Sequence, residues 1–71
     1  MIEIVLHRSG KWLIALNPCH EKGDLIFEYA WTGWTWAKGS ELFLYFDSRS
    51  DACAHLKANR NQLEIEFFRV K

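Results

Sequence analysis

Apolar and polar side chains alternate at the start of the chain, and this period-two pattern predicts two strands, over 2–6 and 12–16. A three-residue loop that ends in Gly10, with this glycine in the left-handed conformation, pairs Leu6 with Trp12. A two-residue loop would change the register and divide the large apolar residues between the two faces. We therefore expect the longer loop, in a hairpin with one apolar face formed by Ile2, Ile4, Leu6, Trp12, Ile14 and Leu16.

Turn-forming residues separate this hairpin from the next strands. The segment 17–24 contains proline and glycine together with asparagine and aspartate, and it predicts the longest loop of the chain. A strand then begins at Leu25 and continues past Gly33, where a bulge would change the face that its aromatic residues take. A turn over 37–39 leads into a further strand over 41–46, in which leucines alternate with aromatic residues.

A helix and a final strand are predicted from the last part of the sequence. Ser48, followed by Asp51, is typical of a helix N-terminus, because the serine oxygen can accept a bond from a backbone N–H group. This helix extends to about Asn59, a residue type that tolerates a left-handed helix exit. Over 63–67, apolar residues alternate with glutamate, which predicts a strand. The expected fold class is α+β, with a five-stranded antiparallel sheet, flat or strongly curled, one short helix packed on one face, and the order β-β-β-β-α-β.

The chain has 71 residues, which predicts a single domain over 1–71 with one hydrophobic core. Its nine basic and nine acidic side chains give a formal charge of zero, which argues against affinity gained mainly by neutralising phosphates. No apolar run reaches the roughly 18 residues that span a bilayer, and the N-terminal residues lack the layout of a secretion signal. We therefore expect a cytoplasmic protein that does not contact membranes, with Cys19 and Cys53 reduced.

The polar residues do not form a recognisable catalytic or metal-binding motif. Cys19 and His20 are adjacent, whereas structural zinc ligands usually stand about two to four residues apart. Cys53 and His55 on the predicted helix point about 200° from each other. Phosphate loops, paired carboxylates and cofactor fingerprints are missing from the sequence. We predict that the protein is not an enzyme and has no catalytic residue, no cofactor and no metal.

The apolar residues outnumber the positions that one helix can cover on a five-stranded sheet. Three interpretations remain: the sheet curls and uses both sides as core, a partner covers the second side, or its aromatic residues stack on bases. We expect at least one of Trp31, Trp34 and Trp36 to be buried, and Trp34 or Trp36, nearest the predicted turn, to be the most accessible. The candidates for the second face are Val5, Leu13, Phe43, Tyr45, Phe68 and Val70.

The leading hypothesis is a small non-enzymatic protein-binding module, such as an adaptor or a stoichiometric inhibitor. It would act by occupying the surface of another protein, or of a second copy of itself. Tryptophan and tyrosine are enriched among the residues that dominate interface energies, so the aromatic residues are the expected contacts. The candidate partner-binding residues are Trp34, Trp36, Phe43, Tyr45 and Phe68.

The alternative hypothesis is single-stranded nucleic-acid binding. Aromatic side chains on a sheet can stack on unpaired bases, and cations beside them can contact phosphates. Trp34, Trp36 and Tyr45 would stack in this case. Basic residues at hairpin tips are also commonly just solvated, and no RNA-recognition or cold-shock signature accompanies them. The candidate phosphate contacts are Arg8, Lys11 and Lys38.

Overall fold

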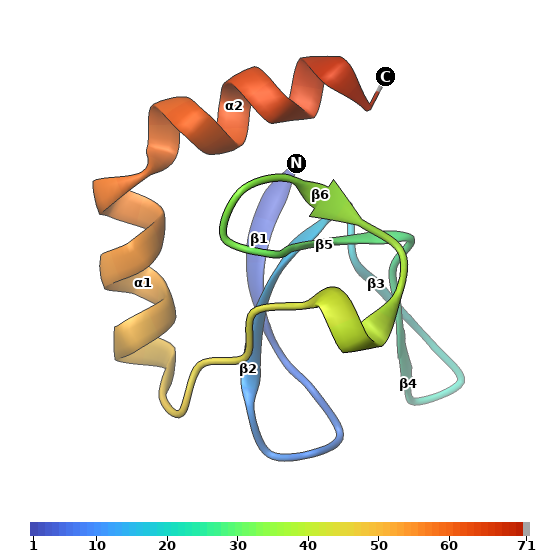
Figure 1. Cartoon of the computed structure of the whole chain (residues 1–71). Helices are drawn as coiled ribbons and strands as arrows, with labels where there is room; N and C mark the ends of the chain where they lie inside the picture. Colours follow the sequence, from blue (N-terminus) through green and yellow to red (C-terminus); the bar gives the residue numbers. More distant parts are fainter. Residues whose placement is uncertain (71) are drawn as a thin grey trace.

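Residues 1–70 are described by a computed structural model, in which short strands precede two C-terminal α-helices (Figure 1). The element bounds, in chain order, are β1 Ile2–Leu6, β2 Trp12–Leu16, β3 Cys19–Glu21, β4 Asp24–Ile26, β5 Tyr29–Trp31, β6 Trp36–Ala37, the 3-10 helix η1 Ser40–Leu42, α1 Arg49–Ala58 and α2 Arg60–Arg69. The four-stranded sheet has the strand order β1-β2-β5-β6, and β3 pairs with β4 in a separate two-stranded sheet.

The first hairpin has the register that the alternating pattern predicts. β1 and β2 pair antiparallel with Leu6 opposite Trp12 and Ile4 opposite Ile14. Gly10 closes the loop with a φ of 89°, in the left-handed region that glycine adopts without steric cost. The predicted register and the predicted glycine conformation are therefore confirmed. Leu6 differs from the other residues of this face because it ends the strand and is exposed.

The turn of the second hairpin lies away from its predicted position. β5 and β6 pair Trp31 with Trp36, so the turn spans 32–35. Gly33 has a φ of 106° in this turn, a conformation that other residue types rarely adopt. The prediction of a turn over 37–39 was wrong, because the positive-φ glycine on which this hairpin depends is Gly33.

The predicted long loop contains a short hairpin of its own. β3 and β4 pair Cys19 with Ile26, and the turn between them holds Lys22 with a φ of 54° and Gly23 with a φ of 85°. Two consecutive residues with positive φ are typical of the two-residue turns that match the twist of paired strands. The single strand predicted from Leu25 is consequently divided, because β4 belongs to this hairpin and β5 to the main sheet.

The segment predicted as a strand over 41–46 pairs with the sheet at only a few points. η1 occupies its start, and the chain is extended after it. Phe46 forms an isolated antiparallel bridge with Trp12. The Trp12 N–H donates to the Phe46 carbonyl over 2.8 Å, and the Phe46 N–H donates to the Trp12 carbonyl over 2.9 Å. The Leu44 N–H donates to the Trp31 carbonyl over 2.9 Å. This segment therefore lies along the ends of β2 and β5 and does not extend the sheet.

The first helix begins where the sequence predicts it. The Asp51 N–H donates to the Ser48 Oγ over 3.1 Å, which confirms Ser48 as the N-cap of α1. Ala52 is the buried residue of this helix. Asn59 has a φ of −120° and joins α1 directly to α2, so the predicted left-handed exit is not formed.

The second helix occupies the segment predicted as the last strand, and that prediction was wrong. Leu63, Phe67 and Val70 recur at helical spacing and all pack in one apolar cluster. The alternation over 63–67 is too short to distinguish a period of two from a helical period, and Leu, Glu, Gln and Arg all favour helix. Neither helix within residues 1–70 is long and apolar enough to cross a lipid bilayer.

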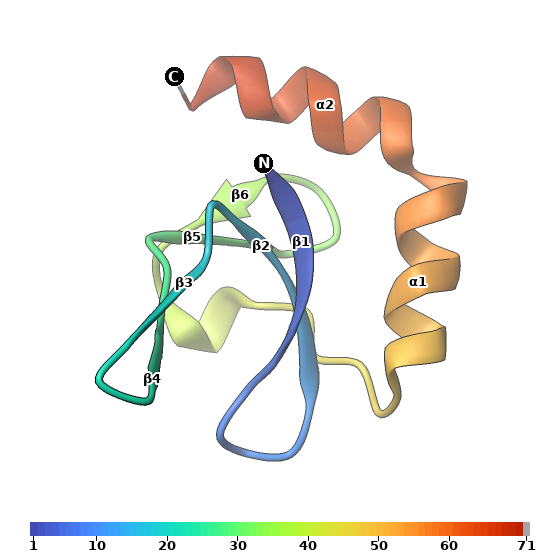
Figure 2. The same cartoon turned by 180° about the vertical axis from the view of Figure 1, so that it is seen from behind.

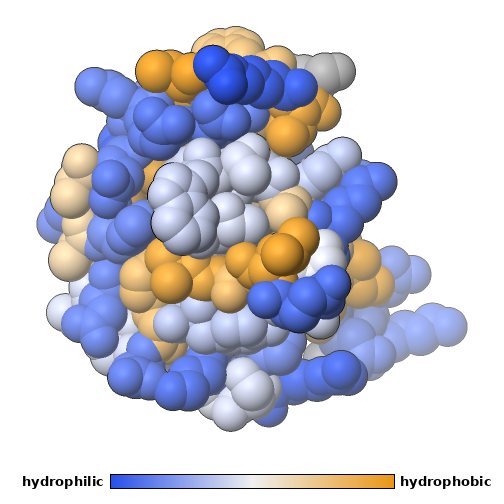
Figure 3. Space-filling model, in the orientation of Figure 1, coloured by the Kyte–Doolittle hydropathy of each residue, from blue (hydrophilic) through white to orange (hydrophobic). Residues whose placement is uncertain are grey.

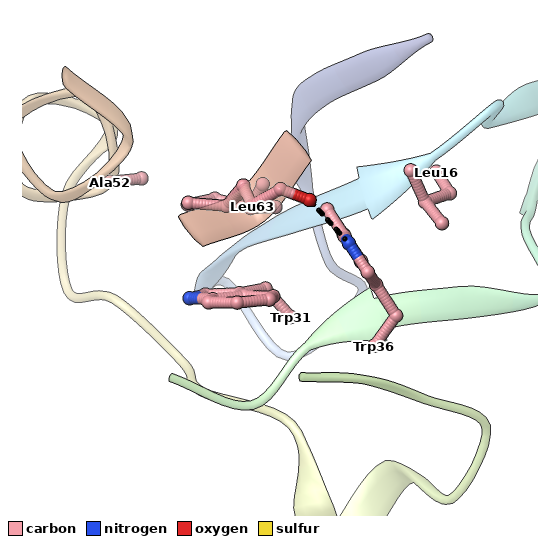
Figure 4. Packing of buried hydrophobic residues seen from close by; sticks show 6 residues of the cluster. Leu16, Trp31, Trp36, Ala52 and Leu63 are labelled. Carbon is pink, nitrogen blue, oxygen red and sulfur yellow. Dashed lines mark hydrogen bonds between the residues drawn. The ribbon is translucent and has the colours of Figure 1, made fainter. Parts of the chain in front are cut away.

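The expected five-stranded sheet with one helix is incorrect, because the strands form a four-stranded and a two-stranded sheet and two α-helices follow them. Both faces of the first hairpin are covered. α1 and α2 follow one another around one face, and the β3–β4 hairpin lies on the far side of the molecule from α1 (Figures 1 and 2). The second face of the first hairpin has its own apolar cluster, in which Val5, Leu13 and Ala15 pack against Leu25, Phe27, Phe43 and Tyr45. Between the helices and the sheet, one apolar cluster contains the buried residues Ile14, Leu16, Trp31, Trp36, Ala52 and Leu63 (Figure 4).

Candidate partner-binding surface

Trp36, one of the candidate partner-binding residues, lies in the core. Its side chain is 3 % exposed and contacts Trp31 edge to face, with ring centroids 5.1 Å apart. The indole Nε1–H donates to the Leu63 carbonyl over 3.0 Å, so the β5–β6 hairpin is bonded directly to α2 (Figure 4). A buried indole N–H normally finds such a partner, because leaving it unpaired is costly.

Phe43 and Tyr45 are half-buried and belong to the second apolar cluster. The centroids of the Phe43 and Phe27 rings are 5.6 Å apart. The Tyr45 hydroxyl donates to the Ser40 carbonyl over 3.0 Å, and its ring contacts His7 edge to face. These two aromatic side chains pack on the second face of the first hairpin, for which the sequence predicted no covering helix. They therefore contribute to the fold.

Phe68 is 72 % exposed on α2. Its ring contacts Phe67, with centroids 6.1 Å apart. Phe68 lines a groove of about 450 Å³ together with Met1, Ile2, Arg60, Glu64 and Phe67. Trp34 does not line this groove.

Trp34 is the most exposed large apolar residue within residues 1–70, with 78 % of its surface accessible. It lies in the β5–β6 turn, and Thr32 holds this turn closed. The Thr32 Oγ1 accepts from the N–H groups of Trp34 and Thr35 over 3.3 and 3.2 Å, and it donates to the Thr35 carbonyl over 3.0 Å. The Thr32 backbone N–H donates to the same carbonyl over 3.0 Å. Trp34 therefore lies in a turn whose backbone is closed by hydrogen bonds from both the side chain and the backbone of Thr32.

Apolar side chains accompany Trp34 on this face. Figure 3 shows a band of apolar side chains over the segment 40–46, next to the β5–β6 turn. Leu44 lies close to the turn, because its Cδ2 atom is 3.7 Å from the position that a Cβ on Gly33 would take. Leu42 is exposed on the same segment. An exposed indole on a turn that lies next to Leu44 is the kind of feature that marks interaction sites.

The turn also contacts α2 through a carboxylate that sequence reasoning missed. The Thr35 Oγ1–H donates to the Glu66 Oε1 over 3.1 Å. The other carboxylate oxygen accepts from Gln62 Nε2 over 3.4 Å and pairs with Arg69 Nη1 at 3.3 Å. Glu66 is only 7 % exposed. Its role was not predictable, because on the expected strand Glu66 would have belonged to the solvent face.

Two of the three candidate phosphate contacts are engaged in ion pairs. Lys11 pairs with Asp47, and this hydrogen-bonded ammonium lowers the pKa of the Asp47 carboxyl. Lys38 pairs with Glu28 at 3.0 Å, and the hydrogen bond to Glu28 raises the pKa of Lys38. Arg8 is exposed and forms no salt bridge with any residue in the part of the chain that the structure describes. Lys11 and Lys38 are therefore already neutralised by acidic residues of the same chain.

Among the histidines, His55 has a structural role next to the core. The Trp31 Nε1–H donates to the His55 Nε2 over 3.0 Å, and the Phe46 ring lies 5.3 Å from the imidazole. Burial lowers the pKa of His55, which favours the neutral ring that this bond requires. Cys19 and Cys53 are free thiols, and no group of three His, Cys, Asp or Glu within residues 1–70 is placed to hold a metal ion.

Comparison with protein-family models, curated proteins and solved structures found no match to this chain. Its function must therefore be inferred from the geometry of its own residues. Trp34 is the one tryptophan that the fold does not account for, because the other tryptophans among residues 1–70 are packed in the core or against it.

Proposed function

We propose that this protein is a small non-enzymatic module that binds another protein, with Trp34 as the central contact. The observation that carries the proposal is the exposure of a tryptophan on a turn that is already closed by hydrogen bonds. A buried tryptophan contributes about 150–250 Å² of contact area, so leaving one in water forgoes a large favourable term. Residues of this type dominate the energies of many interfaces.

The rigidity of the turn supports binding for a second reason. A flexible loop loses conformational entropy when it binds, and a preorganised loop avoids most of that loss. The bonds of Thr32 hold Trp34 in one backbone conformation before any partner arrives. The partner that fits this arrangement has an apolar pocket for an indole ring, flanked by apolar surface that covers Leu42 and Leu44. A module of this kind would act by occupying the partner's surface, as an adaptor or a stoichiometric inhibitor does.

The remaining candidate residues have a different part in this proposal. Trp36, Phe43 and Tyr45 hold the framework that presents Trp34, and they do not touch the partner themselves. Phe68 would mark a separate surface on α2. The free thiols suit a reducing compartment, and we propose that the module acts in the cytoplasm.

The test is capture of a partner by the tagged protein from lysate of its native host, in parallel with the variants Trp34→Ala and Phe68→Ala. We expect a captured protein that binds the purified wild type directly and binds Trp34→Ala at least about 30-fold more weakly. Phe68→Ala is the matched control, since it removes an aromatic residue of similar exposure from α2. Equal binding by wild type and Trp34→Ala would contradict the proposal, and loss with Phe68→Ala alone would move the site to α2.

A second copy of the chain is the other protein that could cover Trp34. Sedimentation of the wild type and of Trp34→Ala over a range of concentrations identifies this case. A dimer that dissociates in the variant would make the partner a second copy. A monomer at all concentrations leaves a different protein as the partner.

Single-stranded nucleic acid is a less favoured ligand, because Lys11 and Lys38 are paired with acidic residues. Titration of the tryptophan fluorescence with an oligonucleotide at two salt concentrations tests it. Binding that weakens steeply with salt would support nucleic acid, because affinity gained from phosphates depends on released counterions.

A further inference from the structure

The two threonines of the β5–β6 turn make different contacts. The Thr32 hydroxyl stays within the turn and bonds to its backbone. The Thr35 hydroxyl leaves the turn and donates to Glu66 on α2, which is distant in the sequence. The bond from Thr35 is therefore additional to the bonds within the turn. It fixes the position of the closed turn, and of Trp34 within it, relative to the second helix.

Glu66 is suited to hold the turn because its carboxylate is already oriented by α2. Gln62 and Arg69, its two other partners, lie on the same helix one turn before and one turn after it. They bind one oxygen, Oε2, and leave Oε1 for the Thr35 hydroxyl. A carboxylate that is largely removed from water requires such partners, and a hydrogen bond to a charged group is among the stronger ones in proteins.

We propose that Glu66 is a positioning residue for Trp34, so that docking of α2 on the sheet and partner binding at Trp34 stabilise each other. This inference rests on the proposed function of Trp34. Through the Thr35 hydroxyl, the docked helix restricts the turn to the arrangement that the partner recognises. Because such coupling is reciprocal, a bound partner also holds α2 more firmly in place. Loss of the Thr35–Glu66 bond weakens this coupling and lets the turn open more often, while the Trp36–Leu63 bond and the core keep α2 attached to the hairpin.

The test on the free protein compares wild type with Thr35→Val and Thr35→Ser. Valine has the shape of threonine without the hydroxyl, and serine restores the hydroxyl. Thr35 is exposed, so neither substitution disturbs the core. We expect native-state hydrogen exchange at the Trp34 and Thr35 amides to accelerate by roughly tenfold or more in Thr35→Val, and to return toward the wild-type rate in Thr35→Ser. Unchanged exchange at these amides in Thr35→Val would overturn the proposal.

Ser48→Ala is the control for a merely structural effect. This variant removes the N-cap of α1, away from the turn, and lowers the stability of the whole domain. If Thr35 acts only through global stability, Ser48→Ala accelerates the turn amides as much as Thr35→Val does, and this result would also overturn the proposal. Acceleration confined to Thr35→Val supports local positioning.

Binding to the partner identified through Trp34 provides the second readout. We expect the dissociation constant to rise about fivefold or more in Thr35→Val and to recover in Thr35→Ser. An unchanged dissociation constant would overturn the coupling. The two proposals can fail separately. If Trp34→Ala binds the partner normally, the proposed function fails. If hydrogen exchange still depends on the Thr35 hydroxyl in that case, Glu66 remains the residue that positions the turn. Loss of binding in Trp34→Ala together with unchanged exchange in Thr35→Val would leave the proposed function and remove the inference.

Discussion

Trp34 and Trp36 are two residues apart in the same hairpin, yet one is 78 % exposed and the other 3 %. In a continuous strand, residues two apart point to the same face and would share one environment. The turn over 32–35 separates them, because Trp34 lies in the turn and Trp36 begins β6. The difference teaches that, in a small aromatic-rich domain, the position of a turn decides which tryptophan stabilises the fold and which is available to a partner.

The largest expected effect comes from Trp36→Ala. Removing this side chain takes away buried area and the bond to the Leu63 carbonyl, and we expect the free energy of unfolding to fall by about 3–5 kcal/mol. This is comparable with the total stability of a domain of this size. The variant should therefore be largely unfolded in circular dichroism and urea titration. A folded Trp36→Ala protein that has lost partner binding would reverse the roles of the two tryptophans.

Phe43→Ala tests whether the second apolar cluster is core. Phe43 is half-buried against Phe27 and Tyr45, so we expect a loss of about 1–3 kcal/mol in urea unfolding. Partner binding by the folded fraction should be unchanged. Full stability combined with lost binding would show instead that Phe43 belongs to the interface, as the sequence suggested.

The hydrogen bond between Trp31 and His55 should make the free energy of unfolding depend on pH. Because the pKa of His55 is lowered below its ordinary value of 6.5, the unfolded chain takes up a proton at His55 before the folded protein does. The stability contributed by the neutral ring is therefore complete above pH 6.5 and is lost as the pH falls through the folded pKa. Partial exposure should keep this loss below about 1 kcal/mol.

Urea unfolding at pH 7.5 and pH 5.5 measures this effect. His55→Gln is the control, because its side-chain oxygen can accept the Trp31 bond without titrating in this range. The variant should show a smaller change between the two pH values than the wild type. An equal change in both proteins would assign the pH dependence to other groups.

Trp34→Ala should have the smallest effect on stability. Its side chain is mostly in water, and the bonds of Thr32 that close the turn involve backbone atoms of Trp34 and Thr35, not the indole ring. We expect the free energy of unfolding to change by less than about 0.5 kcal/mol. A loss of 2 kcal/mol or more, on the scale expected for core residues, would place Trp34 with Trp36 and remove the basis of the proposed site.

Features that depend on near neighbours in sequence were predictable. The register of the first hairpin follows from the parity of its apolar positions and from Gly10, and the start of α1 follows from Ser48. The exposure of Trp34 was anticipated only as one of two choices. The involvement of Glu66 was not anticipated, because it requires that α2 be a helix and that it lie against the β5–β6 turn.

The sequence by itself determined that the chain is α+β, that it begins with a hairpin of known register and that a capped helix starts after Ser48. These features are set by local periodicity, by glycine conformation and by side-chain capping. Tertiary structure decided that 60–69 is a helix, that β3 and β4 form a hairpin of their own, and that both faces of the first hairpin are buried. Short alternating segments fit either period, and only packing against distant residues selects one of them. The same packing selects which tryptophan remains in water.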